Sequence, residues 1–225
     1  MGKKISYYNN FSKSKFSNLS LQERFELIYN ENFWESDESR SGIGSEIENT
    51  KEALKALEYI IKEYRIKSII DAPCGDFNWM SKMDLKNINY RGYDIVRSVI
   101  KDNNKKFKKS NISFFHSDIT DSKLDKADLM IVRDCLVHFS IEDIKKSIFR
   151  IKQSRSKYLV STSFVNVEKN IDIYTAHWRP INLEKEPFNF PKPLVTINEK
   201  CQEMDGIYAD KSLCLWEINK LPNLN

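Results

Sequence analysis

Strand-like and helix-like segments alternate along the middle of this 225-residue chain, and the alternation limits the folds that it can adopt. Segments with helical periodicity lie between apolar runs, at 77–83, 96–107 and 140–153. The apolar runs predict five strands, at 67–71, 88–94, 112–118, 127–134 and 157–164. This pattern predicts an α/β fold in which helices cover both faces of a mostly parallel sheet.

The chain is predicted to have two parts. Residues 1–44 are a separate N-terminal unit, with a polar arm, a short helix over 21–34 and a polar loop. The main domain is predicted over 45–225, and Ser45 with Glu48 forms a capping box at the start of its first helix.

The alternation ends after the fifth strand. Residues 165–193 form a long irregular insertion, and aromatic anchors at Trp178, Phe188 and Phe190 favour order over disorder. Two more strands are predicted to close the domain, at 194–199 and 212–218.

Composition places the chain among ordinary globular proteins. Apolar residues make up 40% of it and charged residues 30%, with a net charge of +4. This charge forms no concentrated basic patch, so we do not expect nucleic acid as a partner. No run approaches the roughly 20 apolar residues of a membrane span, and the first residues do not form a signal peptide.

The cysteines indicate neither a metal ribbon nor a redox motif. Both need cysteines in CxxC spacing, whereas the chain has four scattered ones, Cys74, Cys135, Cys201 and Cys214. Scattered cysteines without a leader predict the reducing cytoplasm as the location. No cluster of histidine and carboxylate residues is evident, so we expect no metal.

Three carboxylates mark the ends of the first three strands. Asp71, in the stretch IIDAPCGDFNWM, is followed by Asp94 and Asp118 at intervals of 94 − 71 = 23 and 118 − 94 = 24 residues. Each interval fits one helix plus one strand. Because parallel strands end at one edge of the sheet, where such folds bind ligands, we expect a single site there.

The turn after Asp71 argues against a dinucleotide. A pyrophosphate requires G-x-G-x-x-G, whereas this turn offers only Gly75. S-adenosylmethionine fits better because it has a sulfonium, an ammonium and a ribose diol, and no phosphate. Asp71 would lie near its methionyl part, Asp94 would accept from the ribose hydroxyls, and Asp118 from the adenine amine, with Ile119 packing on the ring.

The segments DAPCGDFNWM, GYDIV, SDI and DLMIVRDCLVHF resemble the successive motifs of class I S-adenosylmethionine-dependent methyltransferases. The resemblance covers roughly residues 45–218. It implies a Rossmann-like seven-stranded sheet of order 3-2-1-4-5-7-6 with an antiparallel seventh strand. The usual D-x-G-x-G-x-G motif keeps only its aspartate and middle glycine, because Pro73 and Phe77 replace the outer glycines.

A narrower resemblance implies the class of molecule that accepts the methyl group. FWESDESRSGIGS, RDCLVHF and WRPINL…PFNFPKP are similar to segments of methyltransferases from bacterial surface-polysaccharide clusters. That likeness implies O-methylation of a capsule or lipopolysaccharide sugar, such as a heptose or another nucleotide-linked sugar.

The expected cofactor contacts come from the polar loop and from the strand ends. The loop of residues 35–45 is predicted to fold over the methionyl end of the cofactor. The complete set is Trp34, Ser39, Arg40, Ser41, Asp71, Ala72, Pro73, Cys74, Gly75, Asp94, Ile95, Ser117, Asp118, Ile119 and Arg133.

A sugar hydroxyl needs a general base, for which histidine is the usual choice. His138 follows the fourth strand, and His177 lies in the insertion; the sequence leaves open which of them acts. Asp134 is a candidate to orient His138 or to bind a sugar hydroxyl. The expected acceptor contacts are Trp79, Trp178, Arg179 and Asn182.

The sequence therefore predicts an S-adenosylmethionine-dependent O-methyltransferase acting on a small sugar or nucleotide-sugar. No [DN]-P-P-[FYW] motif follows the fourth strand, which argues against methylation of nucleic-acid amines. Three alternatives remain: methylation of a phosphate- or phosphoramidate-type capsule group, non-catalytic binding of an adenosine ligand, and an oxidoreductase, which a test of NAD binding would distinguish. The oligomeric state stays open.

Overall fold

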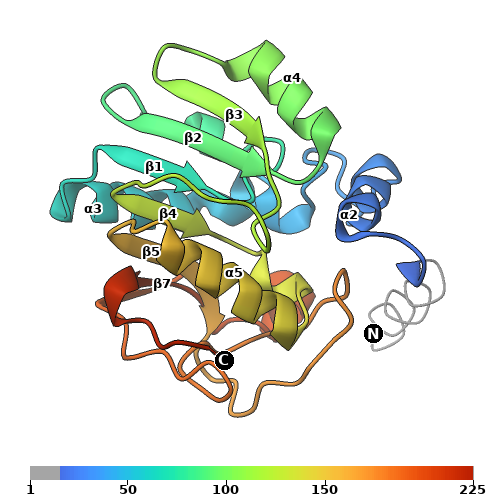
Figure 1. Ribbon diagram of the computed structural model, residues 1–225, viewed down its shortest axis with the longest axis vertical. Coiled ribbons are helices and arrows are strands. Elements are labelled where there is room, and N and C mark those ends of the chain that lie inside the picture. Colours follow the sequence, from blue (N-terminus) through green and yellow to red (C-terminus); the bar gives the residue numbers. More distant parts are fainter. Residues whose placement is uncertain (1–15, 225) are drawn as a thin grey trace.

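The computed structural model describes residues 16–224, so the first part of the predicted arm lies outside the described residues. Its sheet has the order β3-β2-β1-β4-β5-β7-β6 (Figure 1). The strands are β1 (Ser68–Asp71), β2 (Asn89–Asp94), β3 (Ile112–His116), β4 (Leu129–Val132), β5 (Tyr158–Phe164), β6 (Val195–Asn198) and β7 (Lys211–Glu217). Strand β7 is antiparallel to both neighbours, and the β1–β5 pairings are parallel. The predicted topology is confirmed.

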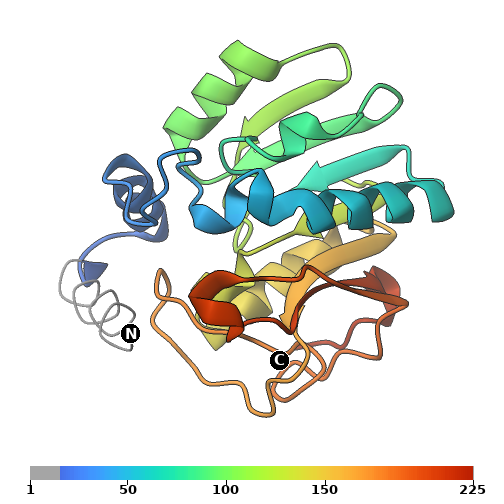
Figure 2. The same cartoon turned by 180° about the vertical axis from the view of Figure 1, so that it is seen from behind.

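Helices cover both faces of this sheet. They are α3 (Lys51–Glu63), α4 (Arg97–Phe107) and α5 (Ile141–Gln153), whereas α2 (Leu21–Asn30) lies beyond the carboxyl ends of the strands (Figure 1). Helix α5 lies on the face seen in Figure 1, and α3 lies on the opposite face, seen in Figure 2. Ile70 packs in the cluster that contains α5, whereas its neighbour Ile69 packs in the cluster that contains α3. Strand residues that alternate between two apolar layers explain why these runs are continuously hydrophobic.

Two helix starts are set by serine caps. Ser20 forms a capping box with Glu23 at the start of α2, and the Ser140 side chain accepts a hydrogen bond from the Asp143 amide at the start of α5. Helix α2 ends earlier than predicted, at Asn30, because Asn32 adopts a left-handed conformation with φ 51°.

One predicted helix and one predicted helix cap are wrong. Residues 77–83 contain only a 3₁₀ turn, Met80–Lys82, because Phe77 has φ 60°, which an α-helix cannot accommodate. The capping box predicted at Ser45 does not form either. Its hydroxyl instead donates to the Ser41 carbonyl, and α3 begins only at Lys51 after two 3₁₀ turns.

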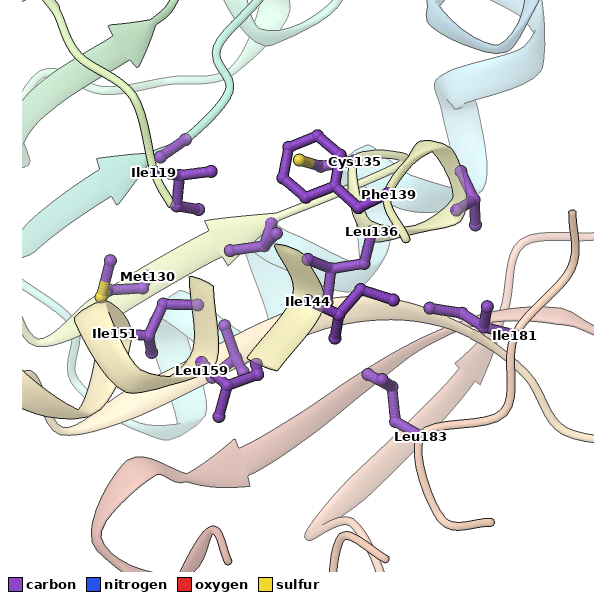
Figure 3. Close-up of a cluster of buried hydrophobic side chains, with 14 of the residues drawn as sticks. Ile119, Met130, Cys135, Leu136, Phe139, Ile144, Ile151, Leu159, Ile181 and Leu183 are labelled. Atoms are coloured by element: carbon purple, nitrogen blue, oxygen red, sulfur yellow. The ribbon is translucent and has the colours of Figure 1, made fainter. Parts of the chain in front are cut away.

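The insertion at 165–193 is ordered and belongs to the core. Ile181 and Leu183 are fully buried and lie near Leu136 and Ile144, as Figure 3 shows. The Asn170 amide donates to the Asn182 and Glu186 carbonyls, which ties the insertion to itself. The insertion therefore supports one side of the strand-end rim.

Candidate functional site

A cavity of about 280 Å³ lies at the carboxyl ends of the parallel strands. Its position is the switch point between β1 and β4, from which the chain proceeds to opposite edges of the sheet. The volume lies near the lower end of the roughly 300–1,000 Å³ of small-molecule sites. Of the predicted residues, the cavity is lined by Trp34, Ser41, Asp71, Ala72, Pro73, Cys74, Gly75, Trp79, Asp94, Ile95, Ser117, Asp118, Ile119, Arg133, Asp134, His138 and Trp178.

The turn after β1 explains the departures from the glycine-rich motif. Gly75 has φ 52°, and a Cβ there would lie 2.3 Å from the Ser41 Oγ, so only glycine fits. Phe77 keeps the left-handed conformation typical of glycine, but its ring is buried between Tyr90 and Phe114, outside the cavity lining. The phenylalanine therefore does not fill the space where a ligand would lie.

Asp94 braces this turn from the end of β2. Its Oδ2 accepts from the Gly75 amide at 3.0 Å, and its Oδ1 accepts from the Val96 amide at 2.9 Å. Burial raises the pKa of Asp94 to about 6, and the hydrogen bonds from Val96 and Gly75 oppose that rise. A carboxylate has about four acceptor positions, so this side chain retains capacity for a diol.

Asp71 is only 2% exposed at the end of β1. The Tyr90 hydroxyl donates to its Oδ2 at 2.6 Å. Burial raises the pKa of Asp71 to about 7, and this effect exceeds the opposite effect of the Tyr90 hydrogen bond. The negative charge of Asp94 raises the pKa further. A bound cation beside Asp71 would favour its ionised form.

We expect Asp71→Asn to gain stability over the wild type as the pH rises. The pKa of Asp71 is higher in the folded protein, about 7, than its usual value of 3.8. The free energy of unfolding of the wild type therefore falls as the pH rises between these two values, whereas the neutral asparagine is unaffected. Between pH 5 and 8, the melting temperature of the variant should rise relative to wild type by roughly 5–10 °C. Thermal melts of both proteins without ligand measure this difference, and a pH-independent gap would contradict the buried, proton-holding carboxyl.

The β3 end offers donors and acceptors for a polar ligand. Asp118 Oδ1 accepts from the Thr120 amide and hydroxyl, each at 2.7 Å, which fixes the carboxylate. Ser117 Oγ and Trp34 Nε1 are buried atoms without a hydrogen-bond partner among the described residues, and both side chains line the cavity. Such orphaned groups carry a desolvation cost that a polar ligand would remove.

The loop of residues 35–45 lies over the first turn, but only part of it lines the cavity. The Ser39 hydroxyl and the Arg40 amide donate to Asp76 at 2.9 Å each, and neither residue is among the lining residues. Ser41 does line the cavity. The structure therefore differs from the expected direct contact at Ser39 and Arg40, which instead anchor the loop.

His138 presents a neutral imidazole to the cavity. Its Nδ1 lies 2.9 Å from the His177 carbonyl, which only accepts, so Nδ1 holds the proton and Nε2 holds a lone pair. Burial lowers the pKa of His138 to about 4, although the His177 hydrogen bond and the charge of Asp134 oppose that shift. The Trp34 ring lies beside it, with centroids 5.3 Å apart. His138 thus has the geometry of a base at neutral pH.

His177 lies differently from the prediction of a base on a lid. Its side chain is buried and is not among the cavity-lining residues. The backbone supplies its contact with the site, because the His177 carbonyl orients His138.

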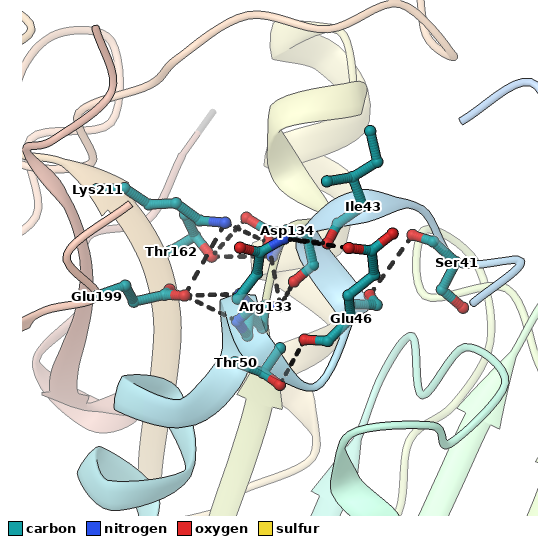
Figure 4. Close-up of polar contacts among 12 residues, drawn as sticks. Ser41, Ile43, Glu46, Thr50, Arg133, Asp134, Thr162, Glu199 and Lys211 are labelled. Atoms are coloured by element: carbon teal, nitrogen blue, oxygen red, sulfur yellow. Dashed lines mark hydrogen bonds and ion pairs between the residues drawn. The ribbon is translucent and has the colours of Figure 1, made fainter. Parts of the chain in front are cut away.

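Asp134 belongs to a buried ion network, shown in Figure 4. Its Oδ2 lies 2.6 Å from Lys211 Nζ and 3.1 Å from Arg133 Nη1. Burial raises its pKa, but the charges of Arg133 and Lys211 outweigh burial and lower the pKa to about 2. Arg133 also bonds Glu199 through Nη2 at 2.6 Å. No hydrogen bond joins the Asp134 and His138 side chains among the described residues, so the expected direct orientation is corrected to a longer-range electrostatic influence.

Two predicted acceptor contacts have structural positions instead. The Arg179 guanidinium is buried and donates to the carbonyls of Leu136, Phe139 and Ile171. The Asn182 side chain donates to the Val165 and Val167 carbonyls. Neither lines the cavity, because the insertion uses both to satisfy its own backbone and that of the His138 turn.

Several lining residues were missed from the sequence, among them Lys211, Glu203 and Tyr208. Strand β7 runs antiparallel to β5, so its first residue reaches the rim where the parallel strands end. The prediction of a final antiparallel strand could therefore have placed Lys211 at this rim. Glu203 and Tyr208 lie on the connection between β6 and β7, a segment without a recognisable sequence motif.

No protein-family model matches the chain, and no curated protein matches its sequence. Solved structures do share its fold. The match to human N-acetylserotonin methyltransferase in complex with SAM covers 95% of this chain and 64% of the human chain, at a TM-score of 0.62 and 12% sequence identity. The N-methyltransferase NodS from Bradyrhizobium japonicum WM9 matches 76% of this chain and 96% of its own, at a TM-score of 0.57 and 13% identity.

A second NodS structure, in complex with S-adenosyl-l-homocysteine, matches 61% of this chain and 73% of its own, at a TM-score of 0.50 and 16% identity. Among the matched structures, this chain spans 66% of the methyltransferase domain of bacterial CtHen1-C. With the strand order above, these likenesses establish the Rossmann-like fold of class I methyltransferases.

Two further findings concern residues 16–224 alone. Within them, no three histidine, cysteine or acidic side chains are grouped so that they could hold a metal ion. None of the helices in this range has the length and apolar character needed to span a bilayer.

Proposed function

We propose that this protein is an S-adenosylmethionine-dependent O-methyltransferase that acts on a sugar hydroxyl. The observation that carries the proposal is the cavity at the β1–β4 switch point, which brings the three strand-end carboxylates and a neutral His138 to one space. The class I methyltransferase fold supports this reading. The structure of human N-acetylserotonin methyltransferase contains SAM, and one NodS structure contains S-adenosyl-l-homocysteine.

The residues present fit this cofactor. Asp94 retains acceptor positions for the ribose hydroxyls, and Asp118 lies next to it at the end of β3 with Ile119 available to pack on adenine. Asp71 lies where a cationic group would favour its ionised form. Ser117 Oγ and Trp34 Nε1 gain partners from a polar ligand. When bound, the cofactor supplies a methyl group already activated by its sulfonium.

His138 is the proposed general base. Its Nε2 takes the proton of the acceptor hydroxyl, and the resulting imidazolium is stabilised by the nearby Asp134 charge. The His177 carbonyl keeps the ring in the required tautomer. The protein otherwise aligns the acceptor and excludes water, which contributes much of the rate of a displacement at an activated carbon.

The charges in the cavity favour a hydroxyl acceptor over a phosphate-type oxygen. Arg133 and Lys211 are the cationic side chains of the described cavity lining, and both are already paired with carboxylates. An anionic acceptor would therefore meet carboxylates without a free cation. Trp178 and Tyr208, with ring centroids 4.7 Å apart, offer the aromatic surface that sugar rings use. The surface-polysaccharide resemblance supports a capsule or lipopolysaccharide sugar, methylated in the cytoplasm.

Calorimetric titration with S-adenosylhomocysteine, with NAD in parallel, tests the cofactor assignment. We expect one-to-one binding of the first ligand alone. Asp94→Asn should weaken that binding by about tenfold or more, because an amide offers one acceptor oxygen to the two backbone donors and the diol.

The exposed Asp84 provides a matched control, and Asp84→Asn should leave the affinity unchanged. Absence of S-adenosylhomocysteine binding, or binding of NAD instead, would refute the proposed function. Binding without transfer to any sugar in a screen by product mass would favour a non-catalytic adenosine-binding protein.

A further inference from the structure

Glu203 is an unpaired carboxylate in the wall of the cavity. It begins the 3₁₀ turn Glu203–Gly206, in which Met204 and Asp205 adopt left-handed conformations with φ 55° and 56°. Its side chain lines the cavity but forms no hydrogen bond or ion pair with the described residues, unlike Asp71, Asp94 and Asp118. Neither the fold nor the cofactor assignment gives this charge a partner.

Glu203 faces a small space kept open by Gly44. A Cβ on Gly44 would lie 3.3 Å from Asp134 Oδ2, 3.5 Å from Glu203 Oε1 and 3.7 Å from Lys211 Nζ. These three polar atoms therefore converge on one point beside the glycine. Lys211 is paired with Asp134 at 2.6 Å. Arg133, whose pKa the charge of Glu203 helps to raise, is paired with Asp134 and Glu199. Glu203 is thus the third carboxylate around two cations that already have partners.

A second orphaned carboxylate oxygen lies behind this point. Glu199 is 5% exposed, and its Oε1 has no hydrogen-bond partner among the described residues. Glu199 lines a neighbouring cavity of about 250 Å³ that shares Cys201, Glu203 and Lys211 with the first. The buried Glu199 oxygen adds to the excess of negative charge beside the half-exposed Glu203, and this excess favours a hydrogen-bond donor with positive charge.

We propose that Glu203 determines specificity by binding a protonated amino group of the acceptor, so that the methylated hydroxyl belongs to an amino sugar. This inference rests on the proposed function. Trp178, Tyr208 and Phe164 form an aromatic cluster next to Glu203 in the same wall, with ring centroids 4.7–6.0 Å apart. Rings of this kind attract both a sugar face and an ammonium group.

The pairing also explains which atom receives the methyl group. A carboxylate next to an ammonium stabilises the charged form, so the nitrogen keeps its proton and has no free lone pair. His138 Nε2 meanwhile accepts the hydroxyl proton. The oxygen is then the nucleophile, although an unprotonated amine would be the better one.

Glu203→Gln tests the proposal, with Asp205→Asn as the matched control. Both variants remove one negative charge from the same turn, but Asp205 is exposed and does not line the cavity. Protein saturated with S-adenosylhomocysteine is titrated with methyl glycosides carrying an amine at the 2, 3, 4 or 6 position and with their N-acetyl partners. Wild type and Asp205→Asn should bind at least one amino glycoside about tenfold more tightly than its N-acetyl partner.

In Glu203→Gln this preference should fall to within about twofold, while the affinity for S-adenosylhomocysteine stays unchanged. A preference that survives in Glu203→Gln, or a wild type that prefers none of the amino glycosides, would overturn the inference alone. Failure of the initial saturation with S-adenosylhomocysteine would instead refute the proposed function.

Discussion

His138→Asn is expected to lower kcat by about 100- to 10,000-fold while it leaves the affinity for S-adenosylhomocysteine nearly unchanged. Asparagine can still donate towards the His177 carbonyl, which His138 Nδ1 contacts at 2.9 Å, so the turn should persist. The variant loses the Nε2 lone pair that takes the acceptor proton. Single-turnover transfer measured by product mass separates this loss of chemistry from a loss of cofactor binding.

The pH profile of kcat/KM for the acceptor, measured with S-adenosylmethionine saturating, provides a second readout for His138. Saturation keeps the titration of Asp71 and Asp94 in the free protein out of the profile. A base works only when unprotonated, so the activity should stay constant near neutrality and fall as the pH drops through about 4. His177→Gln is the comparison, because its backbone carbonyl rather than its ring contacts His138. A loss in His177→Gln as large as in His138→Asn would contradict the assignment of the base.

Strand positions were predictable because they depend on local sequence. β1 and β4 are short apolar runs, and Ile69 and Ile70 show why such a run is continuous, since the two side chains enter opposite apolar layers. Helix starts were less predictable. Ser45 had the sequence of a capping residue, but its hydroxyl bonds the Ser41 carbonyl within a compact polar loop.

Local sequence also fails to predict the backbone of the segment after Gly75. Residues 77–83 contain residue types that tolerate a helix, yet Phe77 takes a left-handed conformation because its ring packs against Tyr90 and Phe114 from other strands. Contacts between distant parts of the chain therefore decided the backbone. The sequence alone carries no sign of such contacts.

The site was predictable where it follows directly from strand ends. Asp71, Asp94 and Asp118 come together because parallel strands finish at one edge. Arg179 looked like a ligand contact because it lies in a polar insertion, but burial commits its donors to three carbonyls. Lys211 comes 77 residues after Asp134, and only the antiparallel pairing of β7 with β5 brings the two together.

Lys211→Met is expected to lower the free energy of unfolding by about 3–5 kcal/mol. The Lys211 side chain is only 7% exposed, and its Nζ lies 2.6 Å from Asp134 and 3.9 Å from Glu199. Burial alone lowers the pKa of Lys211, but the charges of these two carboxylates outweigh burial and raise it. Methionine fills a similar volume, so the loss reports mainly on the buried charges left behind.

Urea unfolding of two further variants separates this charge effect from a loss of packing. Lys200→Met removes an exposed lysine paired with Glu52 at 3.2 Å and should cost no more than about 0.5 kcal/mol. The double variant Lys211→Met with Asp134→Asn should recover part of the loss, because the neutral amide no longer needs a cation and asparagine tolerates the φ of 50° at this position. If the double variant were no more stable than Lys211→Met, Lys211 would stabilise the rim through its aliphatic chain. The ion network in Figure 4 would then contribute little to linking the start of β7 to the end of β4 across β5.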